Sequence, residues 1–352
     1  MNILVVNPGS TSTKIGYFEG DTQIFEEVLR HSSEELAPFA SVTQQYNFRM
    51  GIIEDFLSQK NIQVTDLNGV VGMGGLINPV KGGTYLVNDK MRDDLKNGIQ
   101  GEHASNLGGL IARAIGDKVG IPSYIVDPVV VDEFEPIARI SGHPAIERRS
   151  IFHALNQKAT AREFCAARGL TYETANLIVV HMGGGVSAGI HKQGRVVDAN
   201  NALDGDGPFT PERSGGIPVG DLVKLCFSGK YTEQEIKSMI KGKGGFTGYF
   251  NSNDAKELYE KSATDPQIKL VIDAFAYQVA KEIGLLATVV SGQVNGIILT
   301  GGIAYNKYIV EQITERVSFI AEVAAYPGEN ELDALAQGAL RVLTGKEAAQ
   351  IY

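Results

Sequence analysis

Cysteine is scarce in this chain: Cys165 and Cys226 are its only two, and they lie far apart with no C-x-x-C pair. This spacing excludes a disulfide framework and a cysteine-rich metal site, and it is typical of a reducing compartment. The sequence also has no apolar run of about 18 residues and no basic leader followed by an apolar segment. We therefore expect a soluble, cytoplasmic protein without a membrane partner.

Positive charge is also in short supply. The chain has 32 basic and 41 acidic residues, a formal net charge of −9 and a pI near 5.3. A basic excess that could meet a phosphate backbone is absent, which argues against nucleic acid as a partner. Glycine, in contrast, is abundant, with 41 in 352 residues against a usual share of about 7%. Any phosphate must therefore be bound by a few residues at one site and not by a broadly basic surface. The high glycine content calls for a structural or functional explanation.

The hydrophobic pattern predicts an α/β protein of about two domains, because short β-branched runs alternate with longer amphipathic stretches. The expected strands are 3–6, 70–71, 124–126, 177–180 and 296–300, and the expected helices are 42–59, 104–119, 267–291 and 331–343.

An internal repeat opens the two halves of the chain. Asn2-Ile3-Leu4-Val5-Val6-Asn7-Pro8-Gly9 aligns without a gap with Asn176-Leu177-Ile178-Val179-Val180-His181-Met182-Gly183. In each copy an apolar strand ends in a small-residue turn, resumes at 14–18 or 188–191, and is followed by a third segment at 23–28 or 195–199. The pattern predicts two copies of one β-rich unit, with chance similarity of two buried strands as the alternative.

The turn after the first strand contains Gly9, Ser10 and Ser12 and ends at Lys14. Unobstructed backbone N–H groups, hydroxyls and a lysine can together surround an anion. The turn matches neither a Walker loop nor a dinucleotide fingerprint. Taken singly, it is equally compatible with a simple hairpin.

Two further glycine turns follow apolar strands. Gly183, Gly184 and Gly185 follow His181, and Gly301 with Gly302 follow the strand at 296–300. Three side-chain-poor turns at strand ends favour one extended, phosphate-bearing ligand such as a nucleotide. The alternative for His181 is a buried core histidine.

Together these stretches resemble the acetate and sugar kinase, heat-shock ATPase and actin superfamily, and most closely its acetate kinase branch. Further matching segments occur in the family's order along nearly the whole chain: Gly74-Gly75-Leu76, Gly82-Gly83-Thr84-Tyr85, Glu102-His103-Ala104-Ser105-Asn106, Val126-Asp127-Pro128, Arg148-Arg149-Ser150-Ile151-Phe152-His153, Glu212-Arg213-Ser214-Gly215-Gly216 and Leu299-Thr300-Gly301-Gly302. The resemblance implies a duplicated ribonuclease H-like (actin-like ATPase) two-domain fold with an ATP cleft between the domains. The implied domains are 1–145, with the C-terminal helix 331–352 packing back on it, and 146–330.

The resemblance also implies roles for individual residues. Asn7, Asp127, His181 and Arg213 would be catalytic, with Arg213 meeting the substrate carboxylate and the phosphoryl group in transfer. Gly9, Ser10, Ser12, Lys14, Gly183, Gly184 and Gly185 would hold the ATP or ADP phosphates, and Gly301 with Gly302 would face the adenosine. Asp127 and Glu331 would be linked to Mg²⁺, with Glu329 as the alternative to Glu331. On the residues alone, Asp127 can also cap a turn, and Arg213 can be a surface loop residue.

One residue expected near the substrate differs from the pattern of the family. Kinases of this group that act on butyrate usually have arginine before Gly-Gly-Leu, where this chain has Met73. Met73 would remove about one charge-assisted contact to the acid, worth roughly 1.5–3 kcal/mol if nothing replaces it, or it would widen the pocket. Val180, Pro208 and Phe209, together with Met73, are the expected apolar walls.

The resulting expectation is reversible, Mg²⁺-assisted phosphorylation of a short-chain or branched-chain carboxylic acid, of the butyrate or isobutyrate type, to the acyl phosphate by in-line transfer from ATP. The alternatives are an ATP-binding member of the fold with weak or lost kinase activity, because of Met73, and a kinase acting on a hydroxyl group. From the resemblance we also expect a homodimer or a higher homo-oligomer.

Overall fold

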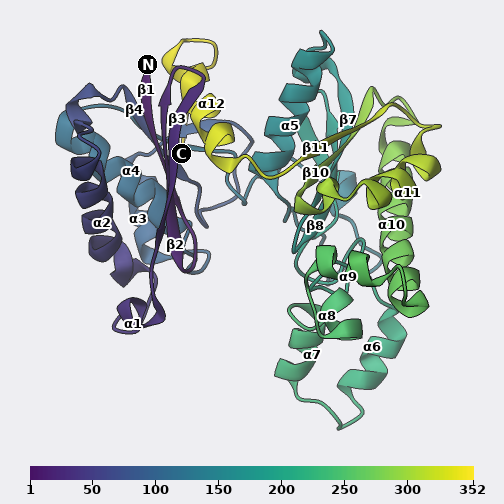
Figure 1. Cartoon of the computed structure of the whole chain (residues 1–352). Coiled ribbons are helices and arrows are strands. Elements are labelled where there is room, and N and C mark those ends of the chain that lie inside the picture. The colour runs from purple at the N-terminus through teal and green to yellow at the C-terminus, as the bar shows by residue number, and fades with distance from the viewer. The chain divides into compact units, whose positions relative to one another are not determined.

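The computed structural model describes all 352 residues. It contains two compact units, Met1–Val131 with Asn330–Tyr352, and Asp132–Glu329. Each unit has its own sheet; strands of the first sheet such as β1 and β4 are purple to blue, whereas in the second sheet β7 and β8 are teal and β10 and β11 are yellow-green (Figure 1). No helix of the structure is both long and apolar enough to cross a bilayer.

The first unit contains a seven-stranded sheet in the order β12-β5-β6-β4-β1-β2-β3. Its strands are β1 (Asn2–Pro8), β2 (Ser12–Glu19), β3 (Thr22–Arg30), β4 (Gly69–Met73), β5 (Thr84–Leu86), β6 (Ser123–Val126) and β12 (Gln350–Ile351). Its helices are α1 (Ser33–Leu36), α2 (Tyr46–Gln59), α3 (Asp89–Asn97), α4 (Asn106–Val119) and α12 (Glu331–Leu343), with the 3-10 turns η1 (Thr43–Gln45) and η2 (Val64–Asp66).

The second unit contains a five-stranded sheet in the order β11-β10-β7-β8-β9. Its strands are β7 (Asn176–Met182), β8 (Val186–Lys192), β9 (Arg195–Ala199), β10 (Gly296–Gly301) and β11 (Val323–Pro327). Its helices are α5 (Ala154–Ala167), α6 (Val219–Cys226), α7 (Glu233–Ile240), α8 (Gly245–Phe250), α9 (Ala255–Lys261), α10 (Pro266–Ala287) and α11 (Lys307–Val317), with the 3-10 turns η3 (Pro136–Arg139), η4 (Tyr172–Thr174), η5 (Thr288–Val290) and η6 (Gly302–Tyr305).

The division between the units falls earlier than the predicted residue 145. Segment 132–145 is part of the second unit, and its hydrogen bonds explain why. The backbone N–H of Glu135 donates to Val197 O at 3.0 Å, and the buried Lys158 ammonium donates to Glu133 Oε2 at 2.8 Å. These contacts are long-range, so local sequence pattern carried no sign of them.

The predicted repeat is confirmed by strand pairing. β1 pairs antiparallel with β2 and parallel with β4, and β7 pairs antiparallel with β8 and parallel with β10. The third strand of each copy is antiparallel to the second, and both pairings shift register once, at Tyr17/Phe18 and at Ile190/His191. The predicted strands and helices are also present, although the helix expected over 42–59 begins as the 3-10 turn η1.

Helices cover both faces of each sheet (Figure 1). In the first unit α4 packs on β4, and α12, from the far end of the chain, packs on β1, β4 and β6. In the second unit α10 lies against β7 and β8, whereas α5 lies against β7 and β10. Glycines allow the close approach of α4, since a Cβ on Gly72 would lie 2.8 Å from Gly109 N. The buried strands are thereby sealed, and their turns are left at the sheet ends.

Candidate functional site

The first glycine turn joins β1 to β2. Gly9 N–H donates to Ser12 O at 2.8 Å, which closes the turn. The turn residues Ser10 and Thr11 are exposed, and their N–H groups donate to no protein acceptor. Lys14 lies opposite Asn7 in the β1–β2 register. This part of the predicted phosphate site therefore brings an amide, a lysine and unpaired backbone donors to one hairpin end.

Asn7 is 8% exposed, and its Nδ2 donates to Glu331 Oε2 at 2.6 Å. Glu331 is the first residue of α12, so the packing of that helix on β1 creates the contact. Glu329 lies in the other unit, where its Oε1 is 3.9 Å from His181 Nε2. The two glutamates between which the sequence left a choice thus have different partners.

Asp127 follows β6 in a left-handed backbone conformation with φ of 38°. Its N–H donates to Gly83 O at 3.0 Å, and its Oδ1 accepts from Gly83 N at 2.7 Å. Such a backbone costs free energy in residues other than glycine, although aspartate tolerates it better than most. Both hydrogen bonds tie the end of β6 to the segment just before β5, which is distant in the sequence.

The second glycine turn joins β7 to β8. Gly183 N–H donates to Gly185 O at 2.9 Å, so this turn closes one residue sooner than the first, in which Gly9 donates to Ser12 O. Thr210 Oγ1 donates to Gly184 O at 2.7 Å and accepts from Arg213 N at 2.9 Å. Gly185 itself lies against the Arg213 guanidinium, which would overlap any Cβ there. The missing side chain is what allows Arg213 to reach this turn.

Arg213 is held by the backbone as well, because its Nη1 donates to Ala202 O at 2.5 Å. Burial lowers the pKa of Arg213, while the acidic Glu212 and Asp204 oppose that shift. At neutral pH the guanidinium stays charged, since arginine does not lose its proton in proteins. A partly buried cation therefore lies directly beside the second glycine turn.

Two histidines stack beside this turn. The His153 and His181 rings are 3.9 Å apart with an interplanar angle of 18°. Burial, and then the positive charge of Arg213, lower the pKa of His153 to about 4. Burial, and then His153, hold the pKa of His181 well below its usual value. Both imidazoles are therefore neutral at pH 7, so neither adds charge or accepts a proton.

The hydrogen-bond network assigns the tautomers of the two rings. Asn156 Nδ2 donates to Glu329 O at 3.0 Å, so its Oδ1 accepts from His181 Nδ1 at 2.8 Å. His181 Nε2 is then an acceptor. His153 Nδ1 lies 2.7 Å from Ser187 Oγ, whose hydroxyl can donate to it and so leave the proton of His153 on Nε2. Nε2 of His153 is thus the hydrogen-bond donor of the pair.

Sequence reasoning did not place His153 or Asn156 in the site, although His153 was within a matching segment. The sequence did contain a sign that both residues face β7. His153 directly precedes α5 and Asn156 follows three residues later, so the two lie on the same side of the helix, the side that packs on β7. Which residue of β7 they would face was not readable from the sequence.

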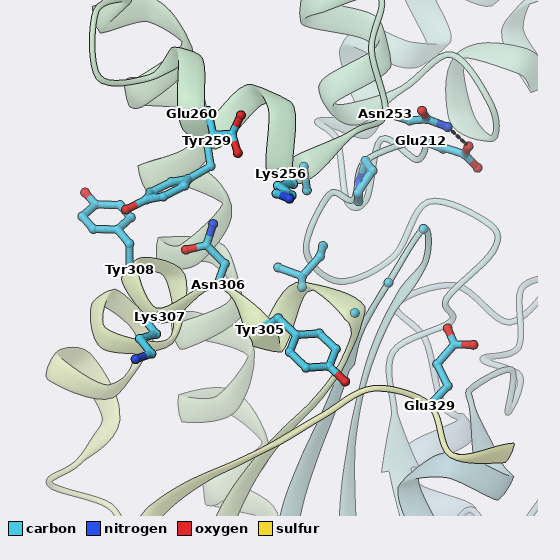
Figure 2. A pocket seen from close by; sticks show the side chains of 16 residues that line it. Glu212, Asn253, Lys256, Tyr259, Glu260, Tyr305, Asn306, Lys307, Tyr308 and Glu329 are labelled. Carbon is cyan, nitrogen blue, oxygen red and sulfur yellow. Dashed lines mark hydrogen bonds between the residues drawn. The ribbon is translucent and has the colours of Figure 1, made fainter.

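A cavity of about 910 Å³ opens beside the second and third glycine turns (Figure 2). Its lining includes Gly183 and Gly184 from one turn and Gly302 from the other. Tyr259 and Tyr308 form an aromatic edge, with ring centres 5.6 Å apart at an angle of 31°. The remaining lining residues are Pro211, Glu212, Asn253, Ala255, Lys256, Glu260, Ile303, Tyr305, Asn306, Lys307 and Glu329. Mixed apolar, polar and aromatic walls of this size suit a ligand as large as a nucleoside.

Gly301 directly precedes the cavity residue Gly302, and we expect Gly301→Ala to lower the free energy of unfolding by about 3 kcal/mol or more. Its φ is +86°, and an added Cβ would lie 2.5–2.8 Å from the backbone of Met182, which cannot rotate away. Gly302→Ala is the matched control, because an added Cβ there meets no atom within 4 Å. Urea unfolding measures both, and equal stability of the two variants would contradict the prediction.

The four residues predicted as apolar walls for the substrate differ in burial. Val180 is fully buried in the core of the second unit, and Phe209 packs edge-on against Phe246 and Phe275 at 5.9 Å each. Their packing is that of core residues, and neither lines the cavity. Pro208 is also buried, whereas Met73 is half-buried at the end of β4 in the first unit. The contact of these four residues with the acid stays a prediction.

Duplicated sheets, helices on both faces and glycine turns at the strand ends define this chain as a two-unit protein of the actin-like ATPase class. The acetokinase family matches residues 143–337. The chain is 56% identical over 351 residues to a probable butyrate kinase of Clostridium botulinum and equally to butyrate kinase 1 of Clostridium acetobutylicum, covering 99% of each. The chain belongs to the acetokinase family.

The fold agrees with that membership. An acetate kinase crystal structure from Porphyromonas gingivalis superimposes with a TM-score of 0.79, covering 96% of this chain and 98% of the other at 18% identity. The family resemblance and the fold class inferred from sequence motifs are therefore confirmed.

Proposed function

We propose that this protein transfers the γ-phosphoryl group of ATP to the carboxylate of a short-chain acid, giving an acyl phosphate and ADP, and that it catalyses the reverse reaction. Family membership and the butyrate kinase relatives support the reaction class. The observation that carries the proposal is the placement of Arg213 and neutral His153 beside a side-chain-free turn that borders a nucleoside-sized cavity.

The chemistry needs no general base. The acid is already ionised at pH 7, so its oxygen can form a bond to the γ-phosphorus while the bond to the bridging oxygen of ADP breaks. No proton is transferred in this exchange. What is needed is positive charge and hydrogen-bond donors around the three phosphoryl oxygens. The Arg213 guanidinium supplies the positive charge, and the neutral imidazole of His153 supplies a hydrogen-bond donor. Neither group takes up a proton during the transfer.

We assign the adenosine to the cavity edged by Tyr259 and Tyr308, with Gly301 and Gly302 forming the backbone wall. The phosphates would contact Gly183, Gly184 and Gly185, and from the first unit the Gly9 turn with Ser10, Ser12, Lys14 and Asn7. Arg213 would bind the acid and the transferring group, and His153 would donate its Nε2–H. His181 would then orient His153 by stacking. The convergence of both turns on one ATP stays a prediction.

Mg²⁺ belongs to the proposal, with Asp127 and Glu331 as the candidate carboxylates. No trio of acidic, histidine or cysteine side chains in the chain forms a complete metal site. This fits magnesium, which usually takes one or two carboxylates and completes its shell with water and substrate phosphates. When bound, the ion would neutralise phosphate charge. Of the two glutamates we favour Glu331, because it accepts from Asn7 and belongs to the same unit as Asp127.

On the acid side, Met73 remains the candidate for tuning chain length, and neighbouring acids should overlap as substrates because one methylene is worth only ~1–3 kcal/mol. Preference for butyrate or isobutyrate, assembly as a homodimer or larger oligomer, and a cytoplasmic location stay predictions.

Trapping of acyl phosphate with hydroxylamine tests the function. With ATP and Mg²⁺, we expect hydroxamate from butyrate and from its branched or slightly shorter neighbours, and none when ATP is omitted. ATP turnover stimulated by a hexose would instead favour the hydroxyl kinase. ATP binding without hydroxamate from any acid between two and six carbons would indicate the inactive alternative.

A further inference from the structure

The first glycine turn rests on a buried arginine that the proposed reaction does not use. Arg49, in α2, is 1% exposed. It forms no ion pair with a carboxylate; its acceptors are neutral oxygens. Taking a guanidinium out of water is costly unless its donors are satisfied, so a buried unpaired cation needs a structural or functional reason.

Four of the six hydrogen bonds of Arg49 go to the turn and the start of β2. Nη1 donates to Gly9 O at 2.8 Å, to Ser12 O at 2.9 Å and to Thr13 Oγ1 at 3.2 Å. Nη2 donates to Ser10 O at 3.0 Å. On its other side, Nε and Nη2 donate to Gln45 Oε1 at 3.1 and 2.8 Å, which fixes the plane of the guanidinium.

These contacts determine which way the turn's N–H groups point. In a trans peptide the carbonyl and the N–H of the next residue point in opposite directions. The chain has no cis peptide bonds. Because Gly9 O and Ser10 O face Arg49, the N–H groups of Ser10 and Thr11 face away from it, and these are the two that donate to no protein acceptor.

We infer that Arg49 is a positioning residue for nucleotide binding: it grips three carbonyls of the first glycine turn so that the Ser10 and Thr11 N–H groups converge on a phosphate oxygen. The inference rests on the proposed role of this turn in holding ATP phosphates. Arg49 itself touches no substrate, but its charge lies behind the turn and polarises both peptide units toward the anion.

The second glycine turn has no such support, although the two hairpins are copies of each other. There Thr210 donates to Gly184 O, and the nearby arginine, Arg213, lies against Gly185 and donates to Ala202 O instead of to the carbonyls of the turn. The duplicated halves thus use their arginines differently. In the first half the cation stabilises the turn from behind, and in the second it is available to the reacting groups.

The test compares Arg49→Lys and Arg49→Ala with Met50→Ala in the full-length chain. Met50, also in α2, is 8% exposed and packs in the apolar core of the first unit. Its side chain makes no hydrogen bond to the turn. We expect both Arg49 variants to lower kcat/KM for ATP about 10–100-fold, since small misplacements of binding groups have effects of this size. KM for the acid should change less than about threefold, and methylguanidinium should partly restore Arg49→Ala.

Met50→Ala should lower the melting temperature while leaving kcat/KM for ATP within about threefold of wild type. If the Arg49 variants do not fold, Gln45→Ala frees the guanidinium plane without removing the arginine and should still weaken ATP selectively, by several-fold. The inference is overturned if Arg49 or Gln45 variants lose only thermal stability, as Met50→Ala does. Failure of the wild-type protein to make acyl phosphate would instead contradict the proposed function. ATP binding measured by calorimetry distinguishes these outcomes, because it tests the role of Arg49 without requiring catalysis.

Discussion

Arg213→Ala should reduce kcat for acyl phosphate formation about 10³-fold or more, the range measured for arginines that stabilise transferring phosphoryl groups. The guanidinium lies against Gly185 and is held by Ala202 O, so its charge is fixed in place before the reaction. KM for ATP should rise much less, because the charge matters most while the phosphoryl group is in transfer. Arg213→Lys should be intermediate, since it keeps the charge and loses the planar fork.

Arg149→Ala is the matched control for Arg213. Arg149 belongs to the same unit and pairs with Asp204 at 3.1 Å, but its side chain is 68% exposed. Loss of an exposed pair changes stability by about 1 kcal/mol at most, and kcat should stay within about twofold. Initial rates of hydroxamate formation at saturating ATP and acid measure both variants. A loss of less than about tenfold in Arg213→Ala would remove this residue from the reaction.

The second large effect is a fall in stability below neutral pH. Burial lowers the pKa of His153 to about 4 and those of His181 and His191 well below the usual value. Near pH 6.5 these histidines therefore bind protons in the unfolded chain but not in the folded chain. Stability from these groups is complete above about pH 6.5 and is lost as the pH falls toward the folded pKa, by up to about 1.4 kcal/mol per pH unit for each histidine.

Urea unfolding at pH 8, 7, 6 and 5, followed by a signal from the second unit, measures this slope. His191→Gln provides the comparison, because His191 is fully buried between Tyr172 and Gln157 and lies outside the proposed reaction. The variant should lose the contribution of about one proton to the slope between pH 6.5 and 5. A wild-type stability that is flat across this range would mean that the imidazoles are charged in the folded protein.

Much of the fold was predictable because its signals are local. The apolar runs at 3–6 and 177–180, each followed by a glycine turn, identified both hairpins and their duplication, and strand pairing confirmed it. Arg49 carried a readable signal too, since it shares a helical stripe with Ile53, Phe56 and Leu57, all of them buried. An arginine on a buried stripe needs partners, but the sequence did not name the turn as the partner.

The sequence by itself determined both hairpins, their duplication and the longest helices, because strand periodicity and turn composition are properties of neighbouring residues, and the order of its motifs along the chain carried the family resemblance. Only the tertiary structure decided that Arg49 supports the Gly9 turn, that His153 stacks on His181, and that Val180 and Phe209 belong to the core. These outcomes depend on which distant segments meet and exclude water. Burial and hydrogen-bond partners, and with them the protonation of the site, follow from that packing.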